Sequence, residues 1–355
     1  MKLVIVAALL VVLAACISAS PAPVSLKARA NACNGDSKLC SKKYSNVTYV
    51  GTHDSFSVGD RSKMGANQEV KVTKQLQDGI RALEIQGQKG EQSQDSPSGI
   101  NLCHTSCAIN DGGSLESYLK DVNNWLKQNP NEVVTIIISN PDNLPVAQWA
   151  KGFESSGIKD MAYTSSSGTV SKNDWPTLQE MISKNQRVVV FMDYKTNPKQ
   201  TNYILPEFSN VWNDPYDQLK IPFNCTPDRF QGHTNQMMYL HNHFINQKKS
   251  LFGKSFTVPD TGKLDSTNSK GQVLSSANSC AKDHHNYPTF ILVDYYDTAQ
   301  GGALQAAAQM NGVQYNPPPN FGKSSQSRSG AVAIRALGLT HLAGVAILAI
   351  AYYLW

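Results

Sequence analysis

The chain has 355 residues, of which 41% are hydrophobic and 17% are charged. That composition supports a packed core and excludes wholesale disorder. The 24 Gly and 17 Pro residues are too few for a collagen-like or low-complexity chain. The formal net charge is +5, which is mildly basic, and the length suits one large domain or two ordinary ones.

The first 20 residues have the pattern of a secretory signal. Lys2 precedes an apolar run from Leu3 to Ala15, and small residues follow it. The alternative is an N-terminal membrane anchor, but the run is shorter than the roughly 20 residues that a spanning helix needs. We therefore expect residues 1–20 to be removed, and residues 21–44 to form a polar lead-in to the mature chain.

The C-terminal residues 331–355 are mostly apolar and run to the last residue of the chain. A polar linker, residues 313–330, precedes them and contains small residues around Ser324 and Ser325. Small residues, a polar spacer and a terminal apolar tail predict a glycosylphosphatidylinositol anchor signal. A C-terminal transmembrane helix is the alternative. Both interpretations place the protein outside the cell, at the plasma membrane or the cell wall.

Removal of both ends would also change the charge. It takes away three basic residues, Lys2, Arg328 and Arg335, out of 32, and none of the 27 acidic ones. The remaining net charge of about +2 offers no electrostatic argument for a nucleic-acid partner.

Six cysteines remain once Cys16 is lost with the signal. An even number of cysteines in an exported chain predicts three disulfides. Fifteen pairings are open, and proximity in the sequence favours Cys33–Cys40, Cys103–Cys107 and Cys225–Cys280. A zinc site is the rival, but no cysteine pair has the companion histidine spacing. Asn46 and Asn224 begin N-glycosylation tripeptides, which also fit an exported protein.

From residue 45 onward, short β-rich runs alternate with amphipathic segments. The predicted strands are Val47–Val50, Ile80–Ile85, Ile100–Cys103, Val133–Ser139, a weak Met161–Tyr163, Arg187–Asp193, Met237–His241 and Thr289–Tyr295. The predicted helices include Gly113–Gln128, Pro176–Asn185 and Ala299–Asn311. Eight such units in about 250 residues predict an α/β fold, a distorted TIM barrel forming one domain over 45–312. A doubly wound open sheet is the alternative.

Polar side chains gather where these strands end, which is where the chemistry of a TIM barrel is found. His53 and Asp54 follow the first run, Glu84 lies in the second, His104 follows the third and Asp294 lies in the last. Two histidines with neighbouring carboxylates can move protons near neutral pH. We therefore expect in-line cleavage of a phosphodiester, which needs one proton taken from a hydroxyl and another given to the leaving oxygen.

The motifs resemble a known family. Gly51–Ser55, then Gly79–Ile85, then His104 resemble the catalytic X region of phosphatidylinositol-specific phospholipase C, in its bacterial and fungal secreted forms. Asn129–Val134 resembles the turn before the family's fourth strand, and Val293–Tyr295 resembles its last strand. The resemblance covers about residues 45–312. It implies a distorted TIM barrel that cleaves the phosphodiester of a phospholipid or glycolipid.

The resemblance also implies roles. His53 corresponds to the general base that activates the inositol 2-hydroxyl, and Asp294 corresponds to the carboxylate that orients this base. His104 corresponds to the general acid, with Asp54 as its partner. The implied products are a cyclic inositol phosphate and diacylglycerol. Substrate contacts are assigned to polar residues on or near strand ends: Arg81, Gln86, Asn140, Asp193 and Tyr295.

Gln86 departs from the family pattern. Bacterial members carry an arginine there and calcium-dependent members an aspartate, whereas a neutral amide offers less charge stabilisation. Glu84 matches a calcium ligand of the metal-dependent branch. Calcium prefers six to eight oxygen ligands, and few carboxylates accompany Glu84, so a metal-free and a calcium-assisted mechanism both remain open.

The sequence thus predicts a secreted, membrane-anchored, monomeric phosphoric diester hydrolase. One alternative is a metal-dependent glycerophosphodiester phosphodiesterase. The other is a catalytically inactive cell-surface binding protein on the same barrel, for which Gln86 is the main argument.

Overall fold

The computed structural model describes residues 32–251 and 254–323. The predicted signal (1–20), most of the lead-in and the predicted anchor signal (331–355) lie outside these residues. Within the described ranges, no helix combines the length and apolar character that crossing a membrane requires.

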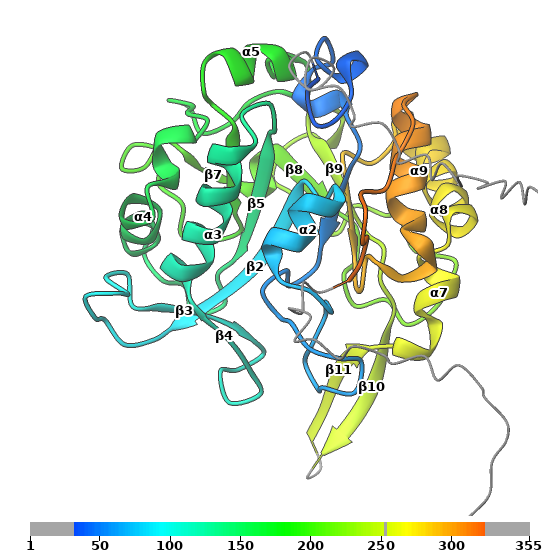
Figure 1. The fold of residues 1–355 in the computed structure, drawn as a ribbon, viewed down its shortest axis with the longest axis horizontal. Coiled ribbons are helices and arrows are strands. Elements are labelled where there is room, and N and C mark those ends of the chain that lie inside the picture. The colour runs from blue at the N-terminus through cyan, green and yellow to red at the C-terminus, as the bar shows by residue number, and fades with distance from the viewer. Residues whose placement is uncertain (1–31, 252–253, 324–355) are drawn as a thin grey trace, which may run out of the picture. The chain divides into compact units, whose positions relative to one another are not determined.

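The core of the fold is a curled sheet of parallel strands in the order β7-β6-β5-β2-β1-β12-β9-β8 (Figure 1). Its end strands, β7 and β8, are joined by a four-residue helix, and no ladder pairs them in the described part of the chain. The sheet is therefore an open, distorted barrel, which confirms the predicted fold class. The strands are β1 (Tyr49–Thr52), β2 (Ala82–Lys89), β5 (Val134–Ser139), β6 (Val188–Met192), β7 (Ile204–Pro206), β8 (Val211–Asn213), β9 (Met238–Asn242) and β12 (Phe290–Val293).

The third predicted strand exists, but it does not belong to the barrel. β3 (Ile100–His104) pairs antiparallel with the far end of β2, from Gly87 to Lys89, and with β4 (Asn110–Ser114). The physical reason is that β2 is eight residues long and extends beyond the ladder it shares with β5. A run of alternating residues predicts a strand, but it does not say which partner that strand finds.

The prediction of a weak fifth strand at Met161–Tyr163 is wrong. The chain there forms a 3₁₀ turn, Ile158–Met161, followed by a single bridge from Ala162 to Val188. The barrel is completed instead by β7 and β8, which the sequence did not predict. Each has only three residues, too few for a periodic pattern to develop.

Helices cover the outside of the sheet (Figure 1). The predicted Gly113–Gln128 helix is confirmed as Leu115–Gln128, with Ser114 accepting a hydrogen bond from the Ser117 amide at its N-terminus. The predicted helix Pro176–Asn185 is confirmed but shorter, as Leu178–Ser183, and Ala299–Asn311 is confirmed as Gly302–Asn311.

The helices are α2 (Val72–Asp78), α3 (Leu115–Gln128), α4 (Val146–Ser155), α5 (Leu178–Ser183), α6 (Glu207–Asn210), α7 (Leu264–Thr267), α8 (Lys270–His284) and α9 (Gly302–Asn311). Turns of 3₁₀ helix lie at Ser37–Leu39, Tyr44–Asn46, Ile158–Met161, Lys172–Asp174, Thr234–Gln236, Thr261–Lys263 and Thr298–Gln300.

Apolar side chains fill the inside of the barrel only up to the level of Leu240 and Leu292. Below them, Phe290 packs against the ring of Phe191 and against the ring of Tyr44, which belongs to the N-terminal lead-in. Above them the lining becomes polar. The packed apolar layer therefore closes the lower part of the barrel, and the polar site lies directly above it.

Gly51 in β1 allows the strands beside the site to approach closely. A Cβ atom at this position would lie 2.5 Å from a methyl carbon of Leu292 and 2.9 Å from the Cβ of Ala82. Only glycine therefore fits between β12 and β2, two residues before His53.

All three predicted disulfides are present. Cys33–Cys40 closes the N-terminal lead-in, and Cys103–Cys107 closes a short loop after β3. Cys225–Cys280 ties the β8–β9 connection to α8.

Candidate active site

His53 lies directly after β1, and Asp294 lies directly after the neighbouring strand β12. The His53 amide donates to the carbonyl oxygen of Val293 at 3.1 Å, so the β1–β12 pairing continues into the site. His53 Nδ1 lies 2.9 Å from Asp294 Oδ1. Because a carboxylate accepts this hydrogen bond, Nδ1 carries the proton and Nε2 faces away from Asp294.

His104 reaches the same place from β3. Its Nδ1 donates to the carbonyl oxygen of Gly65 at 2.7 Å, which leaves its Nε2 directed toward the site. Asp54 lies between the two imidazoles: its Oδ2 is 3.6 Å from His53 Nε2 and 3.5 Å from His104 Nε2. The two rings are 6.2 Å apart between centroids. Two imidazole nitrogens therefore face one shared space, with a carboxylate beside both.

The sequence reasoning missed two neighbours of His53. The Asn67 side-chain amide donates to Asp294 Oδ1 at 2.9 Å, and it comes from the loop between β1 and α2. Phe244 stacks on the His53 ring at a centroid distance of 4.0 Å and an interplanar angle of 3°. An asparagine and a phenylalanine in loops have no distinguishing pattern, so neither could be selected from the sequence.

Charge dominates the protonation of this cluster. Burial alone lowers the pKa of His53, but the carboxylates of Asp294, Glu84 and Asp54 outweigh it and raise that pKa to about 10. Burial raises the pKa of Glu84 to about 7, although His53 opposes this shift. Glu84 Oε2 lies 3.8 Å from His53 Nε2, so the two groups titrate as a pair and proton release from one depends on the other.

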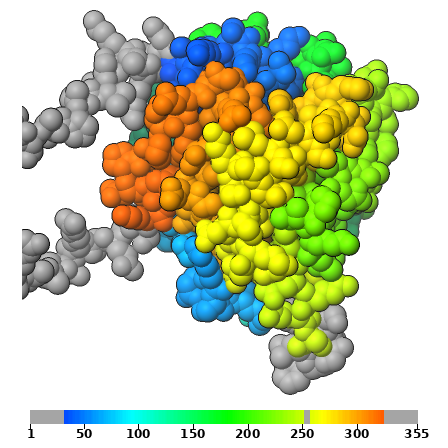
Figure 2. Space-filling view, turned by 90° about the vertical axis from the view of Figure 1, so that its right-hand side faces the viewer, coloured from blue at the N-terminus to red at the C-terminus, as the bar shows by residue number. Residues whose placement is uncertain are grey.

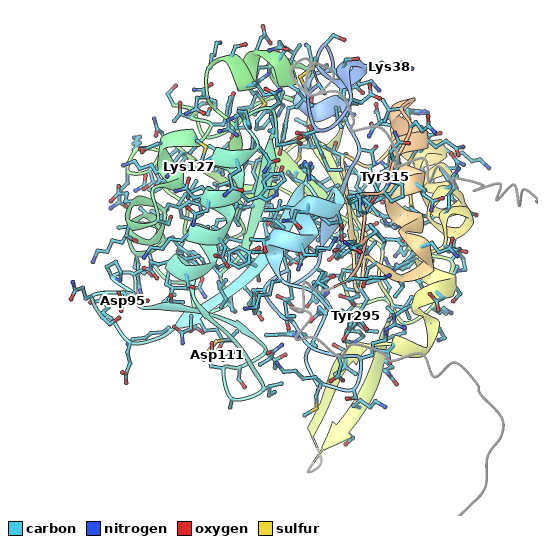
Figure 3. The ribbon with its side chains drawn as sticks, viewed as in Figure 1. Lys38, Asp95, Asp111, Lys127, Tyr295 and Tyr315 are labelled. Atoms are coloured by element: carbon cyan, nitrogen blue, oxygen red, sulfur yellow. A yellow bond between two sulfur atoms is a disulfide. The ribbon has the colours of Figure 1, made fainter. Side chains whose placement is uncertain are left out.

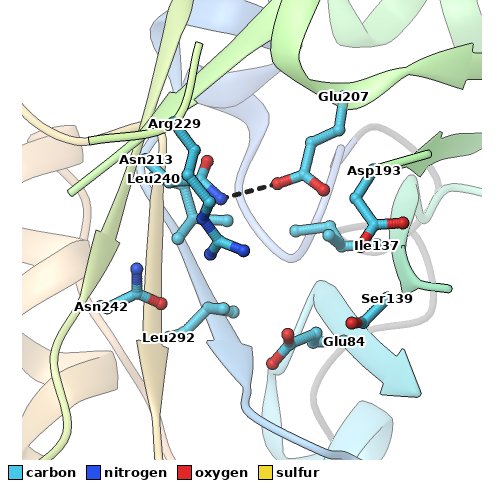
Figure 4. Close-up of a pocket in the computed structure, with 10 residues that line it drawn as sticks. All are labelled: Glu84, Ile137, Ser139, Asp193, Glu207, Asn213, Arg229, Leu240, Asn242 and Leu292. Atoms are coloured by element: carbon cyan, nitrogen blue, oxygen red, sulfur yellow. Dashed lines mark hydrogen bonds between the residues drawn. The ribbon is translucent and has the colours of Figure 1, made fainter. Parts of the chain in front are cut away.

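A polar hollow opens beside this pair at the top of the barrel. Figure 4 shows Arg229 together with the carboxylates of Glu84, Asp193 and Glu207 around it. Burial raises the pKa of Glu207 to about 7, and Arg229 partly offsets the shift. Arg229 Nε and Glu84 Oε2 are buried and lack a hydrogen-bond partner within the described residues. The hollow thus offers a donor and an acceptor that the protein itself does not satisfy.

Arg229 is a third residue of the site that the sequence reasoning missed. It comes from the long β8–β9 connection, where its backbone pairs with Asn213 at the end of β8. Its guanidinium lies over the rings of Phe208 and Tyr216, at 5.3 and 4.8 Å from their centroids. These contacts hold the cation at the hollow.

The predicted substrate contacts lie in different places. Asp193 lines the hollow, where its pKa is raised by burial. Gln86 Oε1 accepts from the Thr105 amide at 3.1 Å, so this amide holds the loop after His104. Asn140 is buried and bonds the backbone of Leu144.

Two more of the predicted contacts do not face the hollow. The Tyr295 hydroxyl donates to the carbonyl oxygen of Ala66 at 2.9 Å, which anchors the loop that carries Asn67. Arg81 precedes β2, at the opposite end of the strand from the site. It pairs with Glu132 at 2.8 Å instead of with Glu84. The structure therefore does not bring Arg81 to the site.

Glu84 lacks the neighbouring oxygen ligands that a calcium ion needs. Among the described residues, no three His, Cys, Asp or Glu side chains form a group that could hold a metal ion. Calcium prefers six to eight oxygen ligands, and the nearest ionisable partner of Glu84 Oε2 is a histidine with a raised pKa. The donors present therefore do not fit calcium.

His241 and His243 form a separate buried network on the outer side of the sheet. His241 Nδ1 lies 2.5 Å from Asp214 Oδ2, and His241 Nε2 lies 2.8 Å from Ser276 Oγ on α8. His243 Nδ1 is 3.1 Å from His241 Nε2, and its Nε2 donates to the carbonyl oxygen of Thr267 at 2.9 Å. These side chains attach α8 to β9 and do not face the hollow.

This network makes the free energy of unfolding depend on pH in the acidic range. Burial, together with neighbouring His241, lowers the pKa of His243 to about 3. An unfolded histidine titrates near 6.5, so between about pH 6.5 and 3 the unfolded state binds one more proton. We expect stability to fall by about 1.4 kcal/mol per pH unit as pH drops through this window.

Denaturant unfolding at several pH values measures that slope. His243→Asn should make the slope shallower, while His233→Asn, at an exposed histidine, should leave it unchanged. An unaltered slope in the His243 variant would show that another group is responsible.

The chain is thus an open α/β barrel with two opposed histidines at one end. The family model described as PI-PLC X 1 matches residues 39–311, and the chain belongs to the PI-PLC X family. A protein of Arthroderma benhamiae named "Uncharacterized secreted protein" is 37% identical over 293 residues, which cover 80% of this chain and 65% of that protein. A PI-PLC X domain-containing protein 1 of the same organism is 36% identical over 287 residues, covering 79% and 90%.

Solved structures agree on the fold. The phosphatidylinositol-specific phospholipase C of Listeria monocytogenes superposes with a TM-score of 0.50 at 16% identity, covering 76% of this chain and 95% of that one. A mutant of the Staphylococcus aureus enzyme gives a TM-score of 0.52 at 14% identity, covering 79% and 96%. At these identities the likeness establishes the fold alone.

Proposed function

We propose that this protein is a phosphodiesterase that cleaves a phosphoinositide-type lipid or glycolipid by acid–base catalysis between two histidines. The observation that carries the proposal is the shared space between His53 Nε2 and His104 Nε2. Each ring has its Nδ1 proton held by an acceptor, 2.9 Å from Asp294 Oδ1 and 2.7 Å from the Gly65 carbonyl oxygen. Both rings are therefore oriented with the second nitrogen available for proton transfer.

The proposed reaction is an internal displacement at phosphorus. In the neutral form of its ring, His53 Nε2 takes the proton of a headgroup hydroxyl next to the phosphate, and the hydroxyl oxygen forms a new bond to phosphorus. Because the pKa of His53 is raised to about 10, this neutral form becomes more populated as pH rises. The bond from phosphorus to the diacylglycerol oxygen breaks, and His104 Nε2 gives its proton to that oxygen. The products are a cyclic phosphate and diacylglycerol. Asp294 stabilises the positive charge on His53, and Asp54 lies beside both rings.

The polar hollow supports a polyol headgroup. Hydroxyl groups can donate to the carboxylates of Glu84, Asp193 and Glu207 and can accept from Arg229. Gln86 brings no charge to the phosphate and is engaged with the Thr105 amide. Arg229 is the basic residue among those that line the hollow, so we assign it the role of stabilising negative charge there.

We propose an extracellular location. The relative from Arthroderma benhamiae that is 37% identical is named a secreted protein, and three disulfides are typical of exported chains. Asn46 and Asn224 are exposed, as N-glycosylation requires. Removal of residues 1–20, anchoring through the signal at 331–355, and action as a monomer complete this proposal.

The test is an assay of full-length protein secreted from a eukaryotic host. Phosphatidylinositol, glycerophosphoinositol and glycerophosphocholine are offered in turn, each with calcium and with chelator, and products are followed by phosphorus NMR. We expect cyclic inositol phosphate from phosphatidylinositol in the presence of chelator. Activity on glycerophosphocholine that chelator abolishes would instead support the glycerophosphodiesterase alternative. Binding of phosphatidylinositol by folded protein without turnover would support the binding-protein alternative.

A further inference from the structure

The general acid of the proposed mechanism lies inside a short loop that a disulfide closes. β3 ends at His104, and the residue before it, Cys103, is joined to Cys107, four positions further along the chain. The Cys103 side chain is fully buried. Asp111, which pairs with Cys103 in the β3–β4 ladder, marks the lower edge of the molecule in Figure 3. The disulfide therefore ties the loop around His104 to a buried strand position.

The backbone inside this loop is in an unfavourable conformation. Thr105 has a φ of 61°, a left-handed value that is uncommon for residues other than glycine and least suited to a β-branched side chain. The Ser106 amide turns back and donates to the His104 carbonyl oxygen at 2.6 Å. A backbone of this kind persists only when the surrounding structure holds it.

Two glutamines of β2 hold this backbone. Gln86 Oε1 accepts from the Thr105 amide at 3.1 Å, and Gln88 Nε2 donates to the Thr105 carbonyl oxygen at 2.9 Å. Both glutamines lie in β2, two positions apart, so their side chains leave the same face of the strand. Together they bind the amide and the carbonyl of a single residue, next to His104.

The backbone of the loop decides where the imidazole of His104 lies. The ring donates from Nδ1 to the Gly65 carbonyl oxygen at 2.7 Å. Asn110, which is the β4 residue paired with His104, donates to the same oxygen at 3.0 Å. A hydrogen bond of this kind sets the tautomer but leaves the ring free to turn about it. The direction of Nε2 therefore depends on a fixed backbone at His104, which the loop supplies.

We propose that Gln86 and Gln88 are positioning residues for His104, the general acid. Together with the disulfide of Cys103, they hold its Nε2 where it protonates the leaving oxygen. Gln86 then acts on the phosphodiester only through His104 and does not stabilise charge on the phosphate, a role that falls to Arg229. This inference rests on the proposed function, which gives His104 its role.

The main test is Gln86→Met, which keeps the length of the side chain and removes the amide oxygen. We expect kcat on phosphatidylinositol to fall about 10²-fold with KM unchanged, the cost of misplacing a catalytic group by about 1 Å. A phosphodiester whose leaving group is an acidic phenol departs without a proton, so the variant should cleave it at nearly the wild-type rate. An equal loss on both substrates would overturn the proposal, because it would mean that Gln86 binds the phosphate or supports the fold.

Two related variants test whether Gln86 acts through the acid. In a His104→Ala background, Gln86→Met should not lower the residual rate on phosphatidylinositol any further, since a positioning residue has no effect once its target is absent. Gln86→Glu keeps an acceptor for the Thr105 amide and should retain most of the activity. A further loss in the double variant, or a loss in Gln86→Glu that exceeds the loss in Gln86→Met, would overturn the proposal, because either would place the side chain at the phosphate.

Gln88→Met and Cys103→Ser/Cys107→Ser should show the same dependence on the leaving group. Each removes one attachment of the loop, so each should slow cleavage of phosphatidylinositol more than cleavage of the phenol substrate. Thermal unfolding reports whether the disulfide variant is folded, and Gln88→Met tests the loop with all disulfides in place. Equal slowing on the two substrates in Gln88→Met would overturn its positioning role.

The matched controls alter similar groups away from His104. Gln305 lies on α9, part of the face shown in orange in Figure 2, and its side-chain amide donates to the Gln300 carbonyl oxygen at 2.9 Å. Gln305→Met should leave both rates unchanged. Cys33→Ser/Cys40→Ser removes the disulfide of the lead-in and should lower stability without changing the ratio of the two rates. A changed ratio in either control would contradict the assignment to the loop.

A measurement without turnover separates this proposal from the proposed function. NMR of the histidine ring nitrogens, assigned with His104→Ala, reports the surroundings of the His104 ring. The His104 signals should shift in Gln86→Met and stay in place in Gln305→Met. Shifted signals in a protein that cleaves no substrate would contradict the proposed function and leave the positioning of the ring supported. Unshifted signals in Gln86→Met would overturn the positioning role, whatever the activity.

Discussion

His53→Ala is expected to lower the rate of phosphodiester cleavage by about 10²–10⁴-fold, which is the usual contribution of a general acid or base. The imidazole lies 2.9 Å from Asp294 and faces the shared space with its other nitrogen, so its removal leaves no base at that point. Initial rates on phosphatidylinositol measure the effect. His233→Ala, at an exposed histidine outside the site, serves as the control and should retain full activity.

The roles of the two histidines can be separated with a second substrate. A phosphodiester whose leaving group is an acidic phenol needs no proton on departure. It should restore much of the activity of His104→Ala and little of the activity of His53→Ala. The opposite pattern would mean that the acid and the base are assigned the wrong way round.

Arg229→Gln is expected to lower kcat/KM by about 10²–10³-fold, the usual cost of removing one preorganised donor. Arg229 has a buried Nε without a partner in the described part of the chain, and the hollow beside Glu84 contains three carboxylates. Arg229→Lys should recover part of the loss, because it restores the charge but not the planar fork of donors.

The same variant should move the pH profile. Arg229 lowers the pKa of Glu84 and of Glu207, so its removal lets both values rise above about 7. The carboxylates then stay protonated to higher pH, and the limb of the rate profile that they govern shifts upward. A lower kcat/KM with an unmoved profile would show that Arg229 does not act through the pKa of Glu84 or Glu207.

Arg81→Gln is the matched control for this prediction. Arg81 is also a partly buried arginine, but it forms an ion pair with Glu132 at the far end of β2. Its loss should lower stability and leave kcat/KM and the pH profile unchanged. The two arginines thus separate a contribution to the site from a contribution to the fold.

The sequence alone was sufficient for the parts of the site that are local. His53, Asp54 and Asp294 lie next to strongly apolar runs, and the ends of adjacent parallel strands meet at one edge of a barrel. His104 was also identified, although its strand was wrongly placed in the barrel. The antiparallel pairing of β3 with the end of β2 still brings His104 to the same edge, beside Asp54. The disulfide pairs were predicted by proximity along the chain.

Only the tertiary structure decided which side chains face the hollow. Arg81 and Arg229 are both arginines in the sequence, but one precedes its strand and lies at the closed end of the barrel. Arg229 lies in the long β8–β9 connection, and the backbone pairing of Arg229 with Asn213 places it at the open end. Phe244 meets His53 across a distance of 191 positions in the chain. Contacts of this kind arise from the path of the loops between strands, and no short-range pattern of residue types encodes that path.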